Sequence, residues 1–169
     1  TSGILSEGNN TTTIENNIID GIGSVGAIAA DVYGILISTN LGLNIDIDGI
    51  TINYNCILNI NNTNSGRCGS GITVGGIDAL NDITNVQITY NDVSNILSNY
   101  DLYTGHGVHG IQINVGGETP VTQNHQDEPI AYLSNGEVFG LDLSHNTINH
   151  LTGKIAHGIG LEGNTLAAM

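Results

Sequence analysis

The chain has 169 residues and a net charge of −14, because 16 acidic side chains face only Arg67 and Lys154 as cations. So few cations argue against binding nucleic acid or anionic membranes, which both attract proteins through Lys and Arg. No apolar run approaches the ~20 residues of a membrane helix, so membrane insertion is not expected. The length suits a single domain over residues 1–169, with an aliphatic core, since Trp is absent and Phe and Met occur once each. A polar surface of Asn, Thr, Ser and Gly is typical of secreted β proteins and predicts a secreted or cell-surface location.

Along the chain, a short segment recurs in which Gly precedes alternating aliphatic residues. Its copies are residues 3–6, 34–37, 71–74, 110–113 and 158–161. Alternation with a period of two predicts half-buried strands. The copies start 31 to 48 residues apart, so the strands are constant while the loops vary, as expected when each coil stacks on the one before.

A second motif lies between these segments and consists of two alternating stretches joined at an asparagine. Its copies are residues 14–22, 52–60, 86–96 and 143–151. An asparagine between two strands indicates a tight turn. We expect the amides at these turns to hydrogen-bond to one another along the stack, as in other asparagine ladders; they are Asn17, Asn55, Asn91 and Asn146. Tyr54 and Tyr90 directly precede two of them and are expected to stack, with His145 following in the same column.

The two motifs together predict an all-β parallel β-helix solenoid with three short strands per coil. The chain provides about four full coils and one extra strand. Parallel stacking at roughly 4.8 Å would pair every strand with its counterpart in the next coil. Helices are disfavoured, because Asn, Gly, Thr and β-branched residues are mediocre helix formers and no segment keeps a 3.6-residue period.

The run from Gly3 through Ile19 and its counterparts resemble the repeats of right-handed parallel β-helix proteins, the pectate-lyase-like superfamily. The resemblance covers nearly the whole chain and implies a right-handed solenoid, a property that alternation alone does not define. The same repeat builds polysaccharide lyases, hydrolases, phage tailspikes, autotransporter passengers and passive surface proteins. Function must therefore be argued from specific residues.

In enzymes of that superfamily, the resemblance implies a catalytic face on the outward side of the Gly-led strands, with a basic residue or clustered aspartates. The outward positions here are expected to be Leu5, Leu36, Thr73, Gln112 and Gly160, and none is ionisable. No catalytic residue is carried over, so the chain is not expected to be an enzyme. His109 and His157 each precede the Gly of such a strand and are expected to form a structural column rather than a metal site.

One long loop interrupts the domain at about residues 114–137 and contains both prolines. Long loops in compact domains are often functional. A tolerated insertion is an equally good interpretation of this segment.

Acidic residues recur at one position of the coil. Asp46, Asp82 and Glu137 each lie six residues before the aliphatic residue that ends the strand preceding the turn. If they stack, three carboxylates would share a column, which disfavours ionisation unless a cation lies among them. With Asp48 and Asp78 in the same loops, these oxygen ligands suit calcium. The alternative is a solvated acidic edge that discourages sideways pairing of strands.

The two cysteines, Cys56 and Cys68, lie twelve positions apart. In a secreted chain this spacing predicts a disulfide that closes a short loop. The alternative is two unrelated thiols.

Two classes of function are consistent with these features. The first is an extracellular structural or interaction protein, an adhesin-like β-helix module of a cell surface or fibre. The chain starts and finishes on a Gly-led strand without a recognisable cap, and uncapped β-helix ends are adhesive. We therefore expect end-to-end self-association into filaments, or contact with neighbouring segments of a longer chain. The second class is a carbohydrate-active enzyme or glycan-binding module, against which the sparse aromatic residues count.

Overall fold

The computed structural model describes residues 1–7, 10–24, 30–38, 46–63, 67–75, 82–99, 107–114 and 138–162. Within these ranges every regular element is a strand, and every strand pair is parallel. The first sheet contains β1 (Ser2–Glu7), β5 (Val32–Ser38), β8 (Gly69–Gly75), β11 (Val108–Asn114) and β14 (Ala156–Glu162). The second contains β2 (Asn10–Glu15), β6 (Ile47–Asn53), β9 (Ile83–Thr89) and β12 (Val138–Asp142). The third contains β3 (Ile18–Asp20), β4 (Gly23–Ser24), β7 (Cys56–Asn62), β10 (Asp92–Ser98) and β13 (Thr147–Thr152).

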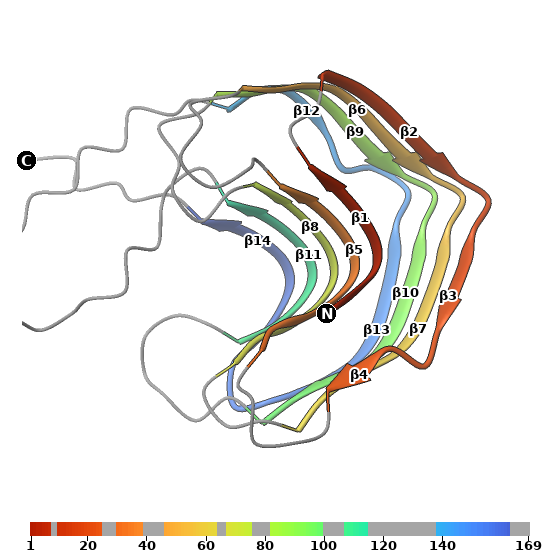
Figure 1. The fold of residues 1–169 in the computed structure, drawn as a ribbon, viewed down its shortest axis with the longest axis vertical. Helices are drawn as coiled ribbons and strands as arrows, with labels where there is room; N and C mark the ends of the chain where they lie inside the picture. The colour runs from red at the N-terminus through yellow and green to blue at the C-terminus, as the bar shows by residue number, and fades with distance from the viewer. Residues whose placement is uncertain are drawn as a thin grey trace, which may run out of the picture.

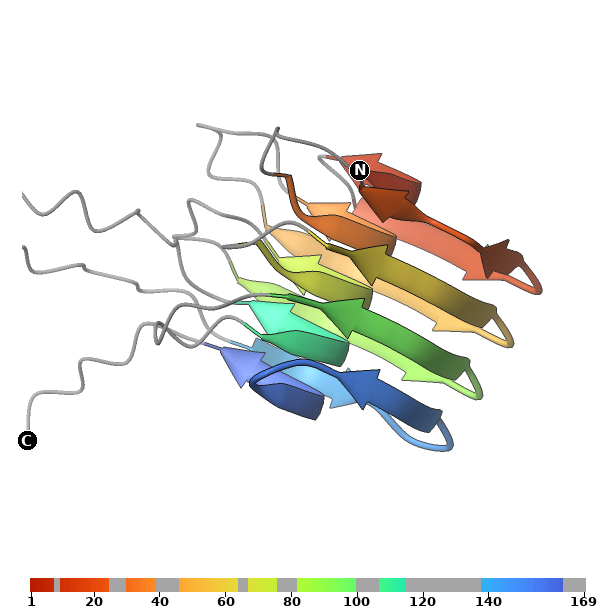
Figure 2. The ribbon, with the colours of Figure 1, turned by 90° about the horizontal axis from the view of Figure 1, so that it is seen from below.

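The chain visits the three sheets in turn, so each coil adds one layer to all of them. In Figure 1 the first sheet curves inside the angle formed by the second and third sheets, and Figure 2 shows the layers stacked from red to blue. Equivalent residues pair from coil to coil; in the first sheet one row is Ile4, Ile35, Ile72, Ile111 and Ile159. The predicted all-β architecture of stacked parallel strands is confirmed, and it is consistent with a parallel β-helix. Residues 115–137, nearly all of the predicted long loop, lie outside the described residues.

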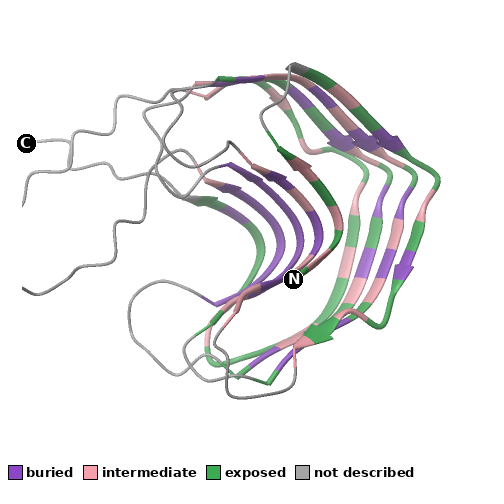
Figure 3. Ribbon diagram, viewed as in Figure 1, coloured by how far each residue is buried: buried purple, intermediate pink, exposed green. Residues whose placement is uncertain are grey.

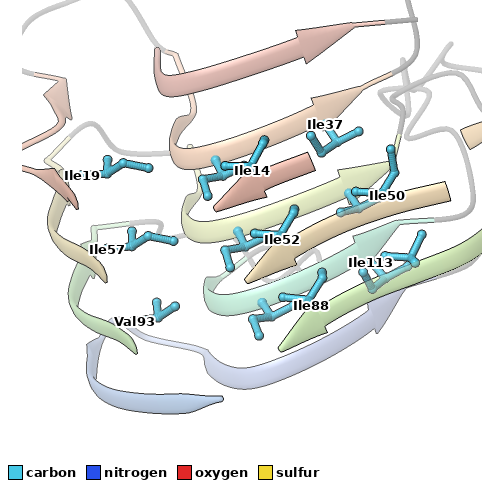
Figure 4. Close-up of a cluster of buried hydrophobic side chains, with 14 of the residues drawn as sticks. Ile14, Ile19, Ile37, Ile50, Ile52, Ile57, Ile88, Val93 and Ile113 are labelled. Carbon is cyan, nitrogen blue, oxygen red and sulfur yellow. The ribbon is translucent and has the colours of Figure 1, made fainter. Parts of the chain in front are cut away.

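The core consists of columns of isoleucine and valine that repeat in every coil. Ile14, Ile52 and Ile88 form one such column in Figure 4, and Ile19, Ile57 and Val93 form another. Their side chains are at most 7% exposed, and those of the inner coils are fully buried. Figure 3 shows the same pattern, with buried residues concentrated on the inner strands and exposed ones on the first and last. Identical shapes stacked at one spacing fill the interior without large aromatic residues.

A glycine column lets the first sheet approach the third. A Cβ on Gly34 would stand 2.5 Å from the Ile57 side chain and 2.5 Å from the carbonyl oxygen of Gly71. A Cβ on Gly110 would meet Ile148 and the carbonyl of Gly158 in the same way. The residue after each of these glycines is also part of the core, so two successive residues face inward and the sheet bends there. The recurring glycines are therefore a packing requirement of the corner.

Backbones with positive φ form three further columns, which the sequence pattern did not predict. Nine non-glycine residues have φ between 53° and 60°, a left-handed conformation that side chains other than Asn and Asp adopt only occasionally. With glycines included, the columns are Thr11, Gly49, Asn85 and Gly140; Asn16, Tyr54, Tyr90 and His145; and Gly21, Asn59, Asn95 and His150. Within each coil, successive members are five residues apart. Each column bends the chain at the same place in every coil, which produces the angular outer wall in Figure 1.

Candidate interaction surface

The four predicted asparagines form a continuous hydrogen-bonded ladder at the turn between the second and third sheets. The backbone amide and side-chain Nδ2 of Asn55 both donate to Oδ1 of Asn91, each at 3.0 Å. Asn17 donates in the same way to Asn55, and Asn91 to Asn146. The side-chain amides of Asn55, Asn91 and Asn146 also donate to a carbonyl of the preceding coil. The bond from Asn91 to the Ile52 carbonyl, for example, is 2.9 Å long. Asn55 and Asn91 are only 2% exposed.

The ladder has a direction, because each coil donates to the following one. Among the described residues, the side-chain oxygen of Asn17 accepts no bond from a preceding coil, and the backbone amide of Asn146 donates to none that follows. An acceptor is thus presented at the first coil and a donor at the fourth. Complementary ends of this type favour head-to-tail contact over head-to-head contact.

An aromatic stack covers the outer side of the same turn. The rings of Tyr54 and Tyr90 lie 5.1 Å apart and nearly parallel, and Tyr90 stacks on His145 at 4.6 Å. These are the left-handed residues that directly precede the ladder asparagines. Tyr54 and Tyr90 are about half exposed, at 56% and 49%. The predicted stacking is present, and it places aromatic surface along the outside of the turn.

A second polar ladder lies on the outer face of the third sheet. Asn95 donates to Asn59 at 3.2 Å, and Asn59 donates to the Asp20 carboxylate at 2.7 Å. The ladder borders a shallow groove whose other residues include Asn61 and Leu97. Exposed amides beside small apolar side chains can hydrogen-bond to a polar ligand.

The outward face of the first sheet differs from the prediction. Thr73 and Gln112 are only 5% and 6% exposed, and the Gln112 Oε1 accepts from Thr73 at 3.3 Å and from the Ser70 hydroxyl at 3.4 Å. Buried His109 stacks on His157 at 5.2 Å, which confirms the predicted histidine column. The inward and outward alternation of side chains changes phase at the glycine bend. The row containing Ser70 and His109, on the other side of that bend, was therefore omitted from the expected outward positions. The Ser70 and Thr73 side chains on this face thus hydrogen-bond to Gln112.

The predicted calcium ligands are only partly within the described residues. Asp46 and Asp82 are adjacent in neighbouring coils, where Oδ1 of Asp46 accepts from the Asp82 backbone amide at 3.0 Å. Asp48 accepts from Thr84 at 2.7 Å and from Asn85 at 2.8 Å, and these hydrogen bonds, with Thr84 first, lower the pKa of its carboxyl below the usual 3.8. Asp78 and Glu137 lie outside the described residues, and the described part of the chain contains no group of three His, Cys, Asp or Glu side chains suited to a metal ion. Calcium binding stays a prediction.

The predicted disulfide between Cys56 and Cys68 is not formed. Cys56 begins β7, whereas the carbonyl of Cys68 accepts from Asn62 at the end of that strand, at 2.8 Å. Six residues of extended chain at about 3.3 Å each separate these two places, far more than the ~6 Å between Cα atoms that a disulfide spans. The twelve-residue spacing was misleading because Cys56 and Asn62 are at opposite ends of β7, which carries the chain away from Cys56.

Comparison with family models, with curated proteins and with solved structures found no match to this chain. No helix among the described residues is both long and apolar enough to cross a membrane. Function must therefore be inferred from the geometry of the coils and their ends.

Proposed function

We propose that the chain is a structural or interaction module of the cell surface or of an extracellular fibre. In this proposal its coils form a right-handed solenoid, as in the pectate-lyase-like superfamily that its repeats resemble. The observation that carries the proposal is the direction of the asparagine ladder. The first coil presents an acceptor and the fourth a donor, so further parallel strands can continue the stack along its axis.

The energetic argument comes from burial at the two ends. Ile57 and Val93 in the inner coils are fully buried, but Ile148, the equivalent residue of the last complete coil, is only half-buried. At the first coil, Ile4 and Ile22 are also half-buried. Covering these residues removes apolar area from water, at about 25 cal/mol per Å². Strand pairing would supply backbone hydrogen bonds in addition.

Sedimentation velocity over a wide range of concentration tests the proposal, with an edge-blocking variant as the control. The Tyr33 amide donates to the Thr1 carbonyl at 2.9 Å, and Tyr33 lies opposite Ser2 in the register, so the amide of Ser2 faces away from β5. Ser2→Pro removes that outward amide, and Ser2→Thr retains it. We expect concentration-dependent association for the natural chain and for Ser2→Thr, and weaker association for Ser2→Pro. Monomers at every concentration, with or without calcium, would contradict the proposal.

A glycan-binding module or carbohydrate-active enzyme is the second candidate, favoured by the groove beside Asn59, Asn61 and Asn95. Binding to a panel of acidic and neutral polysaccharides tests it, together with assays for unsaturated or reducing ends. Binding that is lost in Asn61→Leu would support this candidate. The absence of both binding and product release across the panel would exclude it.

A further inference from the structure

The groove on the outer face of the third sheet is lined by residues of three successive coils. It includes Gly21 and Gly23 of the first coil, where the chain passes from β3 to β4 (Figure 1). A Cβ on Gly21 would meet nothing within 4 Å, and Gly23 lies opposite Asn61 of the next coil. The first coil therefore has no side chain at the outward positions where the second coil has Asn59 and Asn61. The groove has a volume of about 370 Å³, near the lower end of the ~300–1,000 Å³ of small-ligand sites.

The side-chain amides at one border of this groove are held in a single orientation. A carboxylate only accepts hydrogen bonds, so Asn59 must turn its Nδ2 toward Asp20, to which it donates at 2.7 Å. Its Oδ1 then faces the next coil and accepts from Nδ2 of Asn95 at 3.2 Å. Within the described part of the chain, Oδ1 of Asn95 accepts no hydrogen bond, and each Nδ2 retains a second hydrogen. This border therefore presents oriented acceptors and donors to a ligand.

Asn61 contributes one more amide, next to apolar surface. Its side chain is exposed and has no hydrogen-bond partner among the described residues, while its backbone amide donates to the Ile22 carbonyl at 2.9 Å. In the same row, the preceding coil has Gly23 and the following coil has the half-buried Leu97. A ligand at this row would contact a carboxamide, which both donates and accepts, beside an aliphatic side chain.

From this arrangement we infer that the groove binds a short neutral saccharide. The inference rests on the second candidate function and defines its ligand. Sugar hydroxyls donate and accept hydrogen bonds as carboxamides do, and the C–H groups of a sugar ring can pack on Leu97. No residue that lines the groove is cationic. Asp20 and the net charge of −14 would repel an anionic ligand.

An extended peptide matches the same surface poorly. The strand β7 pairs with β3 and β4 on one side and with β10 on the other, and β10 also pairs with β13. Their backbone groups are thus used within the sheet, so a peptide cannot add to it as a further strand. Recognition must come from the exposed side chains, which favours a ligand rich in hydroxyl groups.

NMR titration of the ¹⁵N-labelled chain tests the inference, because the side-chain amides of Asn59, Asn61 and Asn95 give separate signals. The ligands are neutral trisaccharides built from glucose, mannose, galactose, xylose or N-acetylglucosamine, with trigalacturonate as the acidic counterpart and an uncharged Ser-Thr hexapeptide. We expect saturable shifts of these amide signals with at least one neutral trisaccharide, and none with trigalacturonate or the peptide.

Two substitutions in the groove and one outside it locate the binding. Asn61→Ala and Asn95→Gly each remove one amide and should weaken binding about five- to tenfold. Asn149 is exposed on β13 and does not line the groove, so Asn149→Ala should bind as the natural chain does. Circular dichroism checks that all three variants keep the fold.

The outcomes separate this inference from the proposed functions. The inference is overturned if no neutral trisaccharide binds, if the peptide binds as tightly, or if Asn61→Ala and Asn95→Gly bind like the natural chain. Binding of trigalacturonate alone would overturn it too, but would leave glycan binding as the second candidate. End-to-end association is measured without saccharide, and its failure would not affect this inference, because the groove lies on the lateral face of the stack.

Discussion

Replacing Asn91 by leucine removes the central rung of the asparagine ladder. Its Oδ1 accepts two hydrogen bonds from Asn55, and its Nδ2 lies within hydrogen-bonding distance of the Ile52 and Thr89 carbonyls and of Oδ1 of Asn146. Asn55 and Asn91 are almost fully buried, so water cannot replace these partners without opening the turn. At about 1 kcal/mol per bond, and more for a buried group left without a partner, we expect a loss of about 3–5 kcal/mol in the free energy of unfolding.

Asn95→Gly is the matched control. Asn95 lies in β10, which follows the turn at Asn91, and makes one exposed ladder bond, to Asn59. Glycine accepts its left-handed backbone without strain. Its cost should be about 1 kcal/mol or less. Urea unfolding followed by circular dichroism gives both free energies, with the slope used to check that the same surface unfolds. An Asn91→Leu cost no larger than that of Asn95→Gly would refute the structural role of the ladder.

Three further predictions follow from the packing, the carboxylates and the cysteines. Gly71→Ala places a methyl group 2.7 Å from the Gly110 carbonyl oxygen and should lower the free energy of unfolding by about 1–3 kcal/mol. The methyl group of Gly158→Ala meets nothing within 4 Å and should change the free energy of unfolding little. Equal losses in the two variants would contradict the close approach at the glycine column. Hydrogen bonds lower the folded-state pKa of Asp48 below 3.8, so its stabilisation is complete above that value and is lost as the pH falls through the lower folded value. Acid titration should therefore destabilise the natural chain more steeply than Asp48→Asn in this range, and parallel curves would show that the bonds to Thr84 and Asn85 do not form. Reducing agent should leave the unfolding free energy unchanged, since Cys56 and Cys68 are not joined; a clear loss on reduction would overturn this assignment.

The repeats predicted the fold because their signals are local and occur in every coil. Aliphatic residues at a period of two mark the strands. An asparagine that recurs at the same turn can hydrogen-bond to its counterparts when the coils stack, so the ladder of Asn17, Asn55, Asn91 and Asn146 could be predicted. The left-handed columns could not, because Tyr54, Tyr90 and His145 are unusual residues for that conformation. The one sequence signal for these columns is their spacing. In all four coils the left-handed residues are five positions apart, as Gly49, Tyr54 and Asn59 are.

The candidate site was predicted less completely, because it depends on distances and side-chain orientations in space, which spacing along the sequence does not define. The disulfide prediction failed because spacing along the sequence does not distinguish a closed loop from a strand that separates its two ends, as β7 does between Cys56 and Asn62. The histidine column was predicted, but the outward orientation of the row containing Ser70 and His109 was not, because the sheet bends at Gly71 and Gly110, where two successive residues face the core.

Electron microscopy of the purified chain tests the central claim most directly. If the coils extend along their axis by adding parallel strands, the images should show rods of the width of one chain, and averaged images should contain an axial repeat of about 4.8 Å. Single compact particles, or assemblies without that axial repeat, would contradict the account.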